Sequence, residues 1–439
     1  MLAASACVAR AADADVHAPA PPAASIIVGG QTKTISSLDA AALLMQAGRV
    51  ADAKKVLLAL EKASPDDSQV LFMLGLIAVQ EKDYDTAIRR FRRILVKEPG
   101  VARVRLELAR AFFLKRDWDN AEREFRLARA AKLPPEAIAN IDGYLYAIRQ
   151  SRRWTFNLSL ALAPDTDVNA GPAISQIDIF GLPFQLSDQA RKQSGVGAAV
   201  DFGGAWSAPI DQRWRLNVGA QFDGRIYPDH DYDDLSLSTF AGPELLLKRW
   251  DLGLRATAFR RWYGGQDYEQ GAGGSASATY YLTGRSGLTG SAGAQTIEFP
   301  ELHEQDGVAV SGSIGGFYAP SPKSLARVNF SYVRQGARTS AYGYSAGQVT
   351  LGYDRDLPGG ISFSLEPSLT VTRYDAPLAA FGDVRSDRQW TAEVAVLDRR
   401  IDVGGFTPRL VYTYTRNDSD IPLYSYNRQR VEVGVTTVF

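Results

Sequence analysis

The most catalytic-looking spacing in this chain is Gly343-Tyr-Ser345-Ala-Gly347, which matches the G-x-S-x-G pattern of serine hydrolases. In that pattern the serine stands on a sharp turn between a strand and a helix, and a histidine later in the chain activates it. No histidine follows Ser345. We therefore interpret the match as a coincidence within a glycine-rich strand, and we predict no catalytic residues and no enzymatic activity.

A second candidate is an acidic segment in which Asp229, Asp231 and Asp233 have the spacing of a calcium-binding loop. The residue after Asp233 is Asp234, where such a loop needs glycine, and Phe240 stands where it needs glutamate. Two interpretations stay open: a weak site that bridges divalent ions or lipopolysaccharide, and a solvated acidic loop. The departures from the pattern favour the solvated loop.

Other metal and cofactor chemistry has little support in the residue types. His17, His230 and His303 lie far apart, without the spacing of metal ligands. Cys7 is the only cysteine, so an intrachain disulfide is impossible. The run Gly271-Ala-Gly-Gly274 is interpreted as a strand of small residues, not as a dinucleotide-binding loop. We predict no metal site and no cofactor.

The carboxyl-terminal strand suggests where the chain works. If residues 431–439 are extended, their alternate residues form one apolar face, and the other face is small or charged. A strand that ends in a terminal Phe is typical of the closing strand of outer-membrane barrels and of the signal that the barrel-assembly machinery reads. The predicted barrel-closing signal comprises Val431, Val433, Val435, Thr437 and Phe439.

The second half of the chain has a strand periodicity from Trp154 onward. Apolar and polar residues alternate from Trp154 to Leu162, and thirteen further segments of this kind can be counted to the end of the chain. Most connections alternate between long and short, with residues 163–194 and 263–268 predicted as long and 398–405 as short. Extracellular loops and periplasmic turns of outer-membrane barrels differ in this way. The sequence therefore predicts a 14-stranded antiparallel transmembrane β-barrel over residues 153–439.

The first half repeats with the 34-residue period of tetratricopeptide repeats, as Ala53, Ala87 and Ala121 show. The pattern predicts an α-helical tetratricopeptide solenoid over residues 34–152, with a final capping helix from about 135 to 150. Its concave face should carry side chains from the first helix of each repeat, either as core residues between helices or as contacts to a ligand. These predicted residues are Met45, Gln69, Phe72, Leu76, Arg103, Arg110 and Phe113.

The amino-terminal residues 1–33 are predicted to be a signal-peptide remnant and an Ala/Pro-rich linker. The basic start of a signal peptide is missing, and the residues before Cys7 form a poor acylation motif. The whole chain has 49 basic and 49 acidic residues, which gives no reason to expect nucleic acid as a partner. The fold class is thus a two-domain α + β protein, with helices first and a barrel second.

Two segments carry a resemblance to a known family. Leu160-Ala-Leu-Ala-Pro-Asp-Thr-Asp-Val-Asn-Ala-Gly171 and Phe259-Arg-Arg-Trp-Tyr-Gly-Gly-Gln-Asp-Tyr268 resemble the surface lipoprotein assembly modulators, and the resemblance extends over residues 35–439. The resemblance implies an amino-terminal tetratricopeptide domain in the periplasm and a fourteen-stranded barrel in the outer membrane. It also implies export of lipoproteins, or of some soluble haem- or metal-scavenging proteins, to the cell surface.

From this resemblance we expect an outer-membrane translocator with a periplasmic helical domain. The expected partners are an exported lipoprotein or secreted protein, the barrel-assembly machinery, and outer-membrane lipid and lipopolysaccharide. Two alternative functions stay open, an exopolysaccharide-export porin and a general diffusion porin with a helical scaffold. A diffusion porin explains the barrel but gives the repeats no role.

Overall fold

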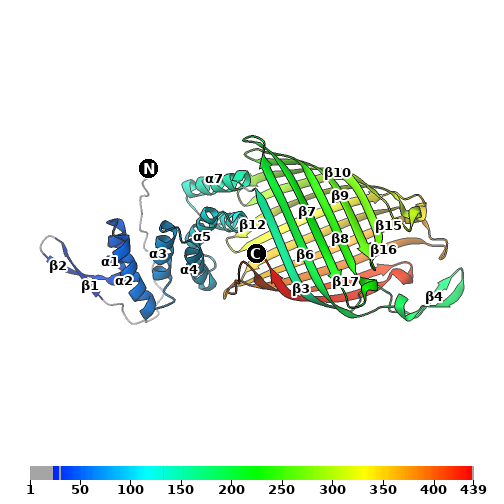
Figure 1. The fold of residues 1–439 in the computed structure, drawn as a ribbon, viewed down its shortest axis with the longest axis horizontal. Helices are drawn as coiled ribbons and strands as arrows, with labels where there is room; N and C mark the ends of the chain where they lie inside the picture. Colours follow the sequence, from blue (N-terminus) through cyan, green and yellow to red (C-terminus); the bar gives the residue numbers. More distant parts are fainter. Residues whose placement is uncertain (1–22, 29–30, 132, 152, 438–439) are drawn as a thin grey trace. The chain divides into compact units, whose positions relative to one another are not determined.

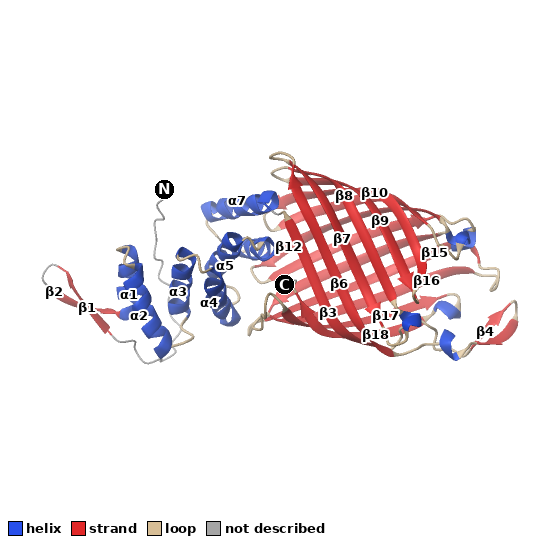
Figure 2. Cartoon of the chain, in the orientation of Figure 1, coloured by secondary structure: helices blue, strands red, loops and turns tan. Residues whose placement is uncertain are grey.

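The computed structural model describes residues 23–28, 31–131, 133–151 and 153–437 (Figures 1 and 2). The chain divides into two compact units, and the boundary between them follows Glu81. The domain boundaries predicted at 33/34 and 152/153 stay predictions. Within the described residues, no helix combines the length and the apolar character needed to cross a membrane.

The described part of the chain contains seven α-helices, which confirms the helical first half. They are α1 (Ser37–Gln46), α2 (Val50–Ala63), α3 (Ser68–Gln80), α4 (Tyr84–Lys97), α5 (Ala102–Lys115), α6 (Trp118–Arg129) and α7 (Pro135–Ser151).

Ahead of the helices lies a short hairpin in which β1 (Ala23–Val28) pairs antiparallel with β2 (Gln31–Ser36). It overlaps the segment for which the sequence predicts a linker. The rest of the predicted signal peptide and linker, including Cys7 and His17, lies outside the described residues.

The 34-residue period has a local structural basis at the turn inside each repeat. Gly48, Lys82 and Arg116 each adopt a positive φ, of 74°, 64° and 67°. Asp83 and Asp117 then cap the next helix, because each side chain accepts a backbone N–H from the residue three positions on. The turn therefore tolerates non-glycine residues in the left-handed region, although this conformation is costly for them.

The second unit contains α4–α7 and a closed antiparallel barrel, as the sequence predicts. The barrel strands of the first half are β3 (Trp154–Asp165), β6 (Gly195–Pro209), β7 (Trp214–Ile226), β8 (Asp234–Leu246), β9 (Trp250–Tyr263), β10 (Gln266–Thr283) and β11 (Ser286–Ile297). Those of the second half are β12 (Gly307–Ser321), β13 (Ser324–Gln335), β14 (Tyr344–Asp356), β15 (Ile361–Pro377), β16 (Val384–Asp398), β17 (Thr407–Ser419) and β18 (Tyr426–Thr436).

The barrel closes by pairing of β18 with β3, the first and last of its fourteen strands. Five residue pairs define this register, from Arg430 opposite Asp165 to Thr436 opposite Ser159. The ladder is interrupted opposite Pro164, and similar gaps lie opposite Pro243 and Pro367 in other strand pairs. Proline has no N–H to donate, so each of these residues removes a ladder bond.

The two faces of the barrel strands differ as a membrane barrel requires. Large apolar side chains point outward and are exposed, for example Trp154 (70%), Leu162 (65%) and Ile314 (68%). The alternate residues line the lumen and are small, polar or charged. The chain thus forms an outer-membrane-type barrel with an apolar belt. Because the barrel is closed, no strand edge is left unpaired.

The two ends of the barrel are named here by what adjoins them. The helix end is where β3 begins at Trp154, just after α7, and the far end is where β3 finishes at Asp165 (Figure 1). The far end carries the longest connection, residues 166–194. This connection contains a small hairpin of β4 (Gln176–Ile179) and β5 (Leu182–Gln185).

The predicted alternation of long and short connections fails in two places. Gly264 and Gly265 alone join β9 to β10 at the far end, where the sequence predicts a long loop over 263–268. Both glycines have positive φ, of 57° and 74°, which suits a two-residue hairpin turn. At the helix end, the connection between β16 and β17, residues 399–406, is longer than the far-end connection between β15 and β16, residues 378–383. The first failure arises because β9 and β10 continue into the residues predicted to form the loop.

Candidate functional site

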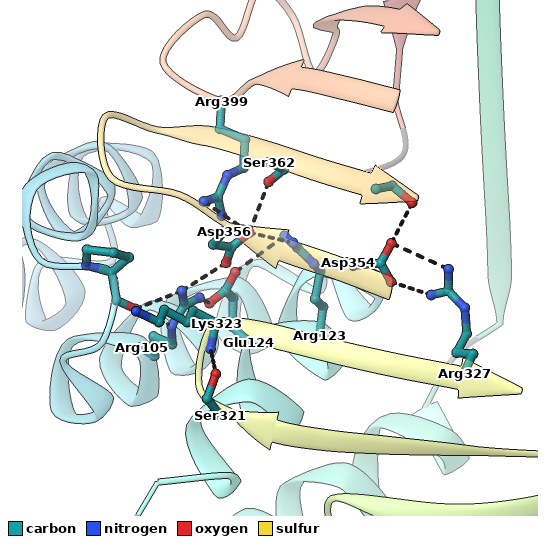
Figure 3. A network of polar contacts seen from close by, with 12 residues as sticks. Arg105, Arg123, Glu124, Ser321, Lys323, Arg327, Asp354, Asp356, Ser362 and Arg399 are labelled. Atoms are coloured by element: carbon teal, nitrogen blue, oxygen red, sulfur yellow. Dashed lines mark hydrogen bonds and ion pairs between the residues drawn. The ribbon is translucent and has the colours of Figure 1, made fainter. Parts of the chain in front are cut away.

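Asp356, the last residue of β14, anchors helices α5 and α6 to the barrel. Its carboxylate accepts hydrogen bonds from Arg105 of α5 at 2.8 Å and from Arg123 of α6 at 3.0 Å. Arg399 lies 3.1 Å away, and the Ser362 hydroxyl donates to the same carboxylate at 2.9 Å. Figure 3 shows the three guanidinium groups and Ser362 converging on Asp356.

Arg105 is the most deeply buried member of this cluster. It is fully buried, and its guanidinium also donates to the Glu124 carboxylate and makes two hydrogen bonds to the Pro99 carbonyl, at 2.9 and 3.1 Å. Asp356 is 1% exposed. A buried charge is tolerated only when it is paired and hydrogen-bonded, and removing one partner typically costs ~3–5 kcal/mol. The helices are therefore held to the barrel by groups that depend on one another.

Burial and neighbouring charges shift the pKa values of two arginines in opposite directions. For Arg123, burial alone lowers the pKa, but Asp356 and Glu124 outweigh it and raise the pKa above its ordinary value. For Arg399, in the turn after β16, burial and the positive charges of Arg123 and Arg105 lower the pKa despite Asp356. Both side chains stay charged at physiological pH, because arginine pKa values are far above it.

Aromatic and glycine residues make a second contact between helices and barrel. Arg126 of α6 lies over the rings of Tyr281 in β10 and Phe317 in β12, at 5.3 and 5.1 Å from their centroids. At the turn between β10 and β11, a Cβ atom on Gly284 would lie 1.7 Å from Arg129 Nε. Glycine at this position therefore permits the close approach of α6 to the turn.

A large cavity opens between the docked helices and the barrel lumen. Its volume is about 1380 Å³, and its walls come from α4–α6 and from lumenal positions of the barrel. The helices contribute Arg89, Lys115 and Glu122, among others. Strands β3, β6 and β13–β17 contribute charged and polar side chains, including Asn157, Asp201, Arg327, Glu366, Glu393 and Arg409. We name this space the vestibule. It joins a helical surface to the lumen, and its walls carry charged side chains of both signs.

The predicted concave-face residues are divided between the two compact units. Met45 packs beside the buried core of the first unit, and Gln69 is exposed, with Phe72 and Leu76 half-buried. In the second unit, Arg103 and Arg110 are exposed. Phe113 packs against Trp118 and Tyr144, with ring centroids 5.4 and 5.0 Å away, as an interhelical core residue would. A shared concave face stays a prediction.

The predicted closing strand occupies the expected place in the barrel. Val433 and Val435 point outward, 56% and 36% exposed, and Val431 is half-buried. Thr437 donates its N–H to Leu158 of β3 and accepts the Leu158 N–H on its hydroxyl. Phe439 lies outside the described residues. The use of this strand as an assembly signal stays a prediction.

The candidate catalytic and metal residues serve strands and turns instead. Ser345 lies in β14, so the strand-turn-helix of a nucleophile elbow is missing at that position. Asp233 accepts the Tyr227 N–H at 2.7 Å and lies 2.9 Å from His230 Nδ1, which closes the loop between β7 and β8. Among the described residues, no three His, Cys, Asp or Glu side chains gather in a metal-binding group.

Sequence reasoning missed the Asp356 cluster. One signal was available, because Arg105 falls on the apolar stripe of its helix, four residues after Val101 and three before Leu108. A charge at such a position needs a buried partner. Its partner Asp356 stands 251 residues away in sequence, at the end of an ordinary strand pattern, and nothing local marks it.

Comparisons with known proteins agree with this architecture. Tetratricopeptide repeat families match residues 38–88 and 78–140. A surface lipoprotein assembly modifier of Pasteurella multocida is 23% identical over 86% of this chain and 78% of its own length. Surface lipoprotein assembly modifier 1 of Neisseria meningitidis is 24% identical, with the same coverage of both chains. A hemophilin secretion modulator of Acinetobacter baumannii is 20% identical over 82% of this chain and 77% of its own length.

The barrel itself gives the family. The surface lipoprotein assembly modifier family matches residues 154–439, which is the whole of the described barrel and more than half of the chain. This confirms the resemblance seen in the sequence, and the chain belongs to the surface lipoprotein assembly modifier family.

Proposed function

We propose that this protein is an outer-membrane translocator that delivers lipoproteins or small secreted proteins from the periplasm to the cell surface. The observation that supports it most is the vestibule, because helices α4–α6 and the lumen share one cavity. A polypeptide held by the helices would already face the polar interior of the barrel. The names of the relatives, which refer to surface lipoprotein assembly and to hemophilin secretion, support the same function.

In this proposal the helical repeats lie in the periplasm and receive the cargo. An extended chain can pass walls that carry both Glu366 and Arg409, because mixed charges favour neither sign of cargo residue. Folding or capture of the cargo outside would give direction to the transfer. We expect no enzymatic step.

The biogenesis of the barrel forms a separate part of the proposal. The outward-facing apolar residues of β18 would be read by the barrel-assembly machinery, and outer-membrane lipid and lipopolysaccharide would then surround the belt. Deleting Phe439 should reduce the amount of folded barrel in the membrane, measured by heat-sensitive migration on gels, without unfolding the helices. Normal assembly of this truncation would contradict the assembly signal.

Surface display on intact cells tests the translocation. An epitope-tagged lipoprotein or secreted protein from the neighbouring reading frame would be expressed with the full chain, with a chain lacking residues 35–150, or without the translocator. The full chain should expose the tag to added protease, and the other two strains should retain it inside. The folded barrel is measured in each strain, so that lost assembly is not mistaken for lost transfer.

The same experiment distinguishes the alternatives. Display that is unchanged without the translocator would contradict the proposed function. Loss of an exported polysaccharide, with display unaffected, would favour polymer export. Display that persists with the barrel alone would remove the helices from the mechanism.

A further inference from the structure

The lumen changes character between its middle and its far end. In the middle, the lumenal side chains of β10–β12 are small and exposed, as Ser277, Ser291 and Ser311 show. At the far end, lumenal or loop side chains are buried, including Tyr227 (4% exposed) and Ile297 (4%). Side chains are therefore more closely packed at the far end than in the middle of the lumen.

On one wall of the far end, an apolar cluster points into the barrel. Ile297, Phe299 and Ala309 are buried there, and Phe259, Tyr268 and Val333 pack against them. The rings of Tyr268 and Phe299 meet edge to face, with centroids 5.8 Å apart. Apolar groups are thus packed together on the inner wall at this end.

Two loops of similar design hold aromatic residues at this end. Tyr227 donates its backbone N–H to Asp233, and Phe299 donates its backbone N–H to Asp306, each at 2.7 Å. In each loop a histidine three residues before the aspartate contacts the same carboxylate. Each loop therefore closes on itself, which fixes the position of its aromatic residue.

Tyrosines line the facing wall. Tyr344 of β14 and Tyr374 of β15 have ring centroids 5.5 Å apart. Arg385 of β16 lies over the rings of Tyr374 and Tyr424, at 4.8 and 3.5 Å from their centroids. Tyr426 of β18 accepts a hydrogen bond from Gln389 at 2.8 Å. These contacts continue the aromatic lining from β14 to β18.

We propose that these rings form a closed collar that blocks the empty barrel and that an exported polypeptide must push apart. We define the far-end collar as Tyr227, Tyr268, Phe299, Tyr344, Tyr374 and Tyr426. Bulky rings that narrow a lumen restrict the passage of ions when nothing else occupies it. Aromatic rings can also pack on many kinds of side chain, so the collar would seal around an extended chain without selecting its sequence.

The test measures ion conductance of the full purified chain in planar lipid bilayers. The first variant carries Tyr268→Ala and Phe299→Ala, and the second carries Tyr344→Ala and Tyr374→Ala on the facing wall. The control carries Phe330→Ala and Tyr332→Ala, which are outward-facing rings of β13, 49% and 54% exposed. Heat-sensitive migration on gels shows which of these proteins have folded barrels.

The unmodified protein and the control should conduct only in rare, brief events. At least one folded collar variant should conduct steadily, about tenfold or more above the unmodified protein, and should sensitise cells to a large antibiotic. Steady conductance of the unmodified protein would overturn the collar, as would two folded collar variants that stay closed. No cargo is needed, so this outcome is independent of the surface-display experiment.

Discussion

The two ends of this barrel use different chemistry. At the helix end, a buried cluster of ionic groups around Asp356 holds the helices beside an open vestibule of about 1380 Å³. At the far end, an apolar group around Phe299 and the facing tyrosines line the lumen. The difference shows that one barrel supports two kinds of packing, with buried ionic bonds between helices and strands at one end and aromatic packing inside the lumen at the other.

The largest expected effect tests the helix end. Asp356→Asn removes the negative charge that compensates Arg105, Arg123 and Arg399, and leaves these guanidinium groups buried together. We expect docked helices to lose ~3–5 kcal/mol of stability. Urea unfolding in detergent, followed by the helical circular dichroism signal, measures the loss while the barrel stays folded.

A matched control uses an ion pair that joins the same parts near the surface. Arg92 of α4 lies 2.8 Å from Asp402, with side chains 21% and 34% exposed. Because water screens this pair, Asp402→Asn should cost only ~0–1 kcal/mol. Equal losses for the two variants would show that the Asp356 cluster is not the main anchor.

The next effect concerns a carboxylate at the far end. Asp167, in the long loop after β3, is fully buried, and its Oδ2 atom has no hydrogen-bond partner. Burial raises the pKa of Asp167 to about 6. The Gly171 N–H and the positive charges of Lys192 and Arg428 oppose this shift, whereas Asp165 adds to it.

The sign of the pH effect follows from the raised pKa. The folded loop favours the neutral carboxyl group of Asp167. The contribution of Asp167 to the stability of the loop is therefore full below its ordinary pKa of 3.8 and is lost as pH rises through about 6. The loss is at most about 3 kcal/mol for a shift of this size. Trypsin cleavage of the loop at Arg191 or Lys192 should therefore increase between pH 5 and pH 7, which lie about one pH unit below and above the pKa of Asp167. Asp167→Asn should flatten this dependence, and an unchanged pH profile would refute the assignment.

A smaller effect should appear at the glycine contact of the helix end. In Gly284→Ala, the new methyl group would meet Arg129 and disturb its ion pair with Asp142. Arg129 is flexible, so we expect a loss of ~1–3 kcal/mol in helix docking. Gly290→Ala is the control, because its Cβ would meet only an oxygen at 3.7 Å. The helical unfolding assay compares the two, and equal stability would remove this contact from the docking surface.

The smallest effect should be a gain in stability within the repeats. Arg116 ends α5 with φ of 67°, a conformation that glycine adopts more easily. Arg116→Gly should stabilise the helices by ~0.5–1 kcal/mol, after the greater freedom of glycine in the unfolded chain is subtracted. Gly48 occupies the equivalent position two repeats earlier. A loss of stability would show that the Arg116 side chain makes contacts that outweigh the backbone strain.

The sequence alone determined the architecture of this protein. A period of two residues specified the fourteen strands, because alternate residues of a strand share one face. A period of 34 specified the repeats, because each repeat is one pair of helices. The pairing of β18 with β3 followed from the even number of antiparallel strands. The family resemblance also came from short segments, one around Asp165 and one around Tyr263.

The tertiary structure alone decided which distant residues meet. Arg105 needed a buried partner, but 251 residues separate it from Asp356, and the strand pattern at Asp356 resembles that of any other strand. The far-end collar combines rings from strands across the barrel, and Gly264 and Gly265 shorten a connection that composition suggested was long. Register and closure set these contacts, and a one-residue change of register would exchange the lumenal and lipid-facing sides. Local patterns fix the elements, whereas closure of the barrel and docking of the helices fix the site.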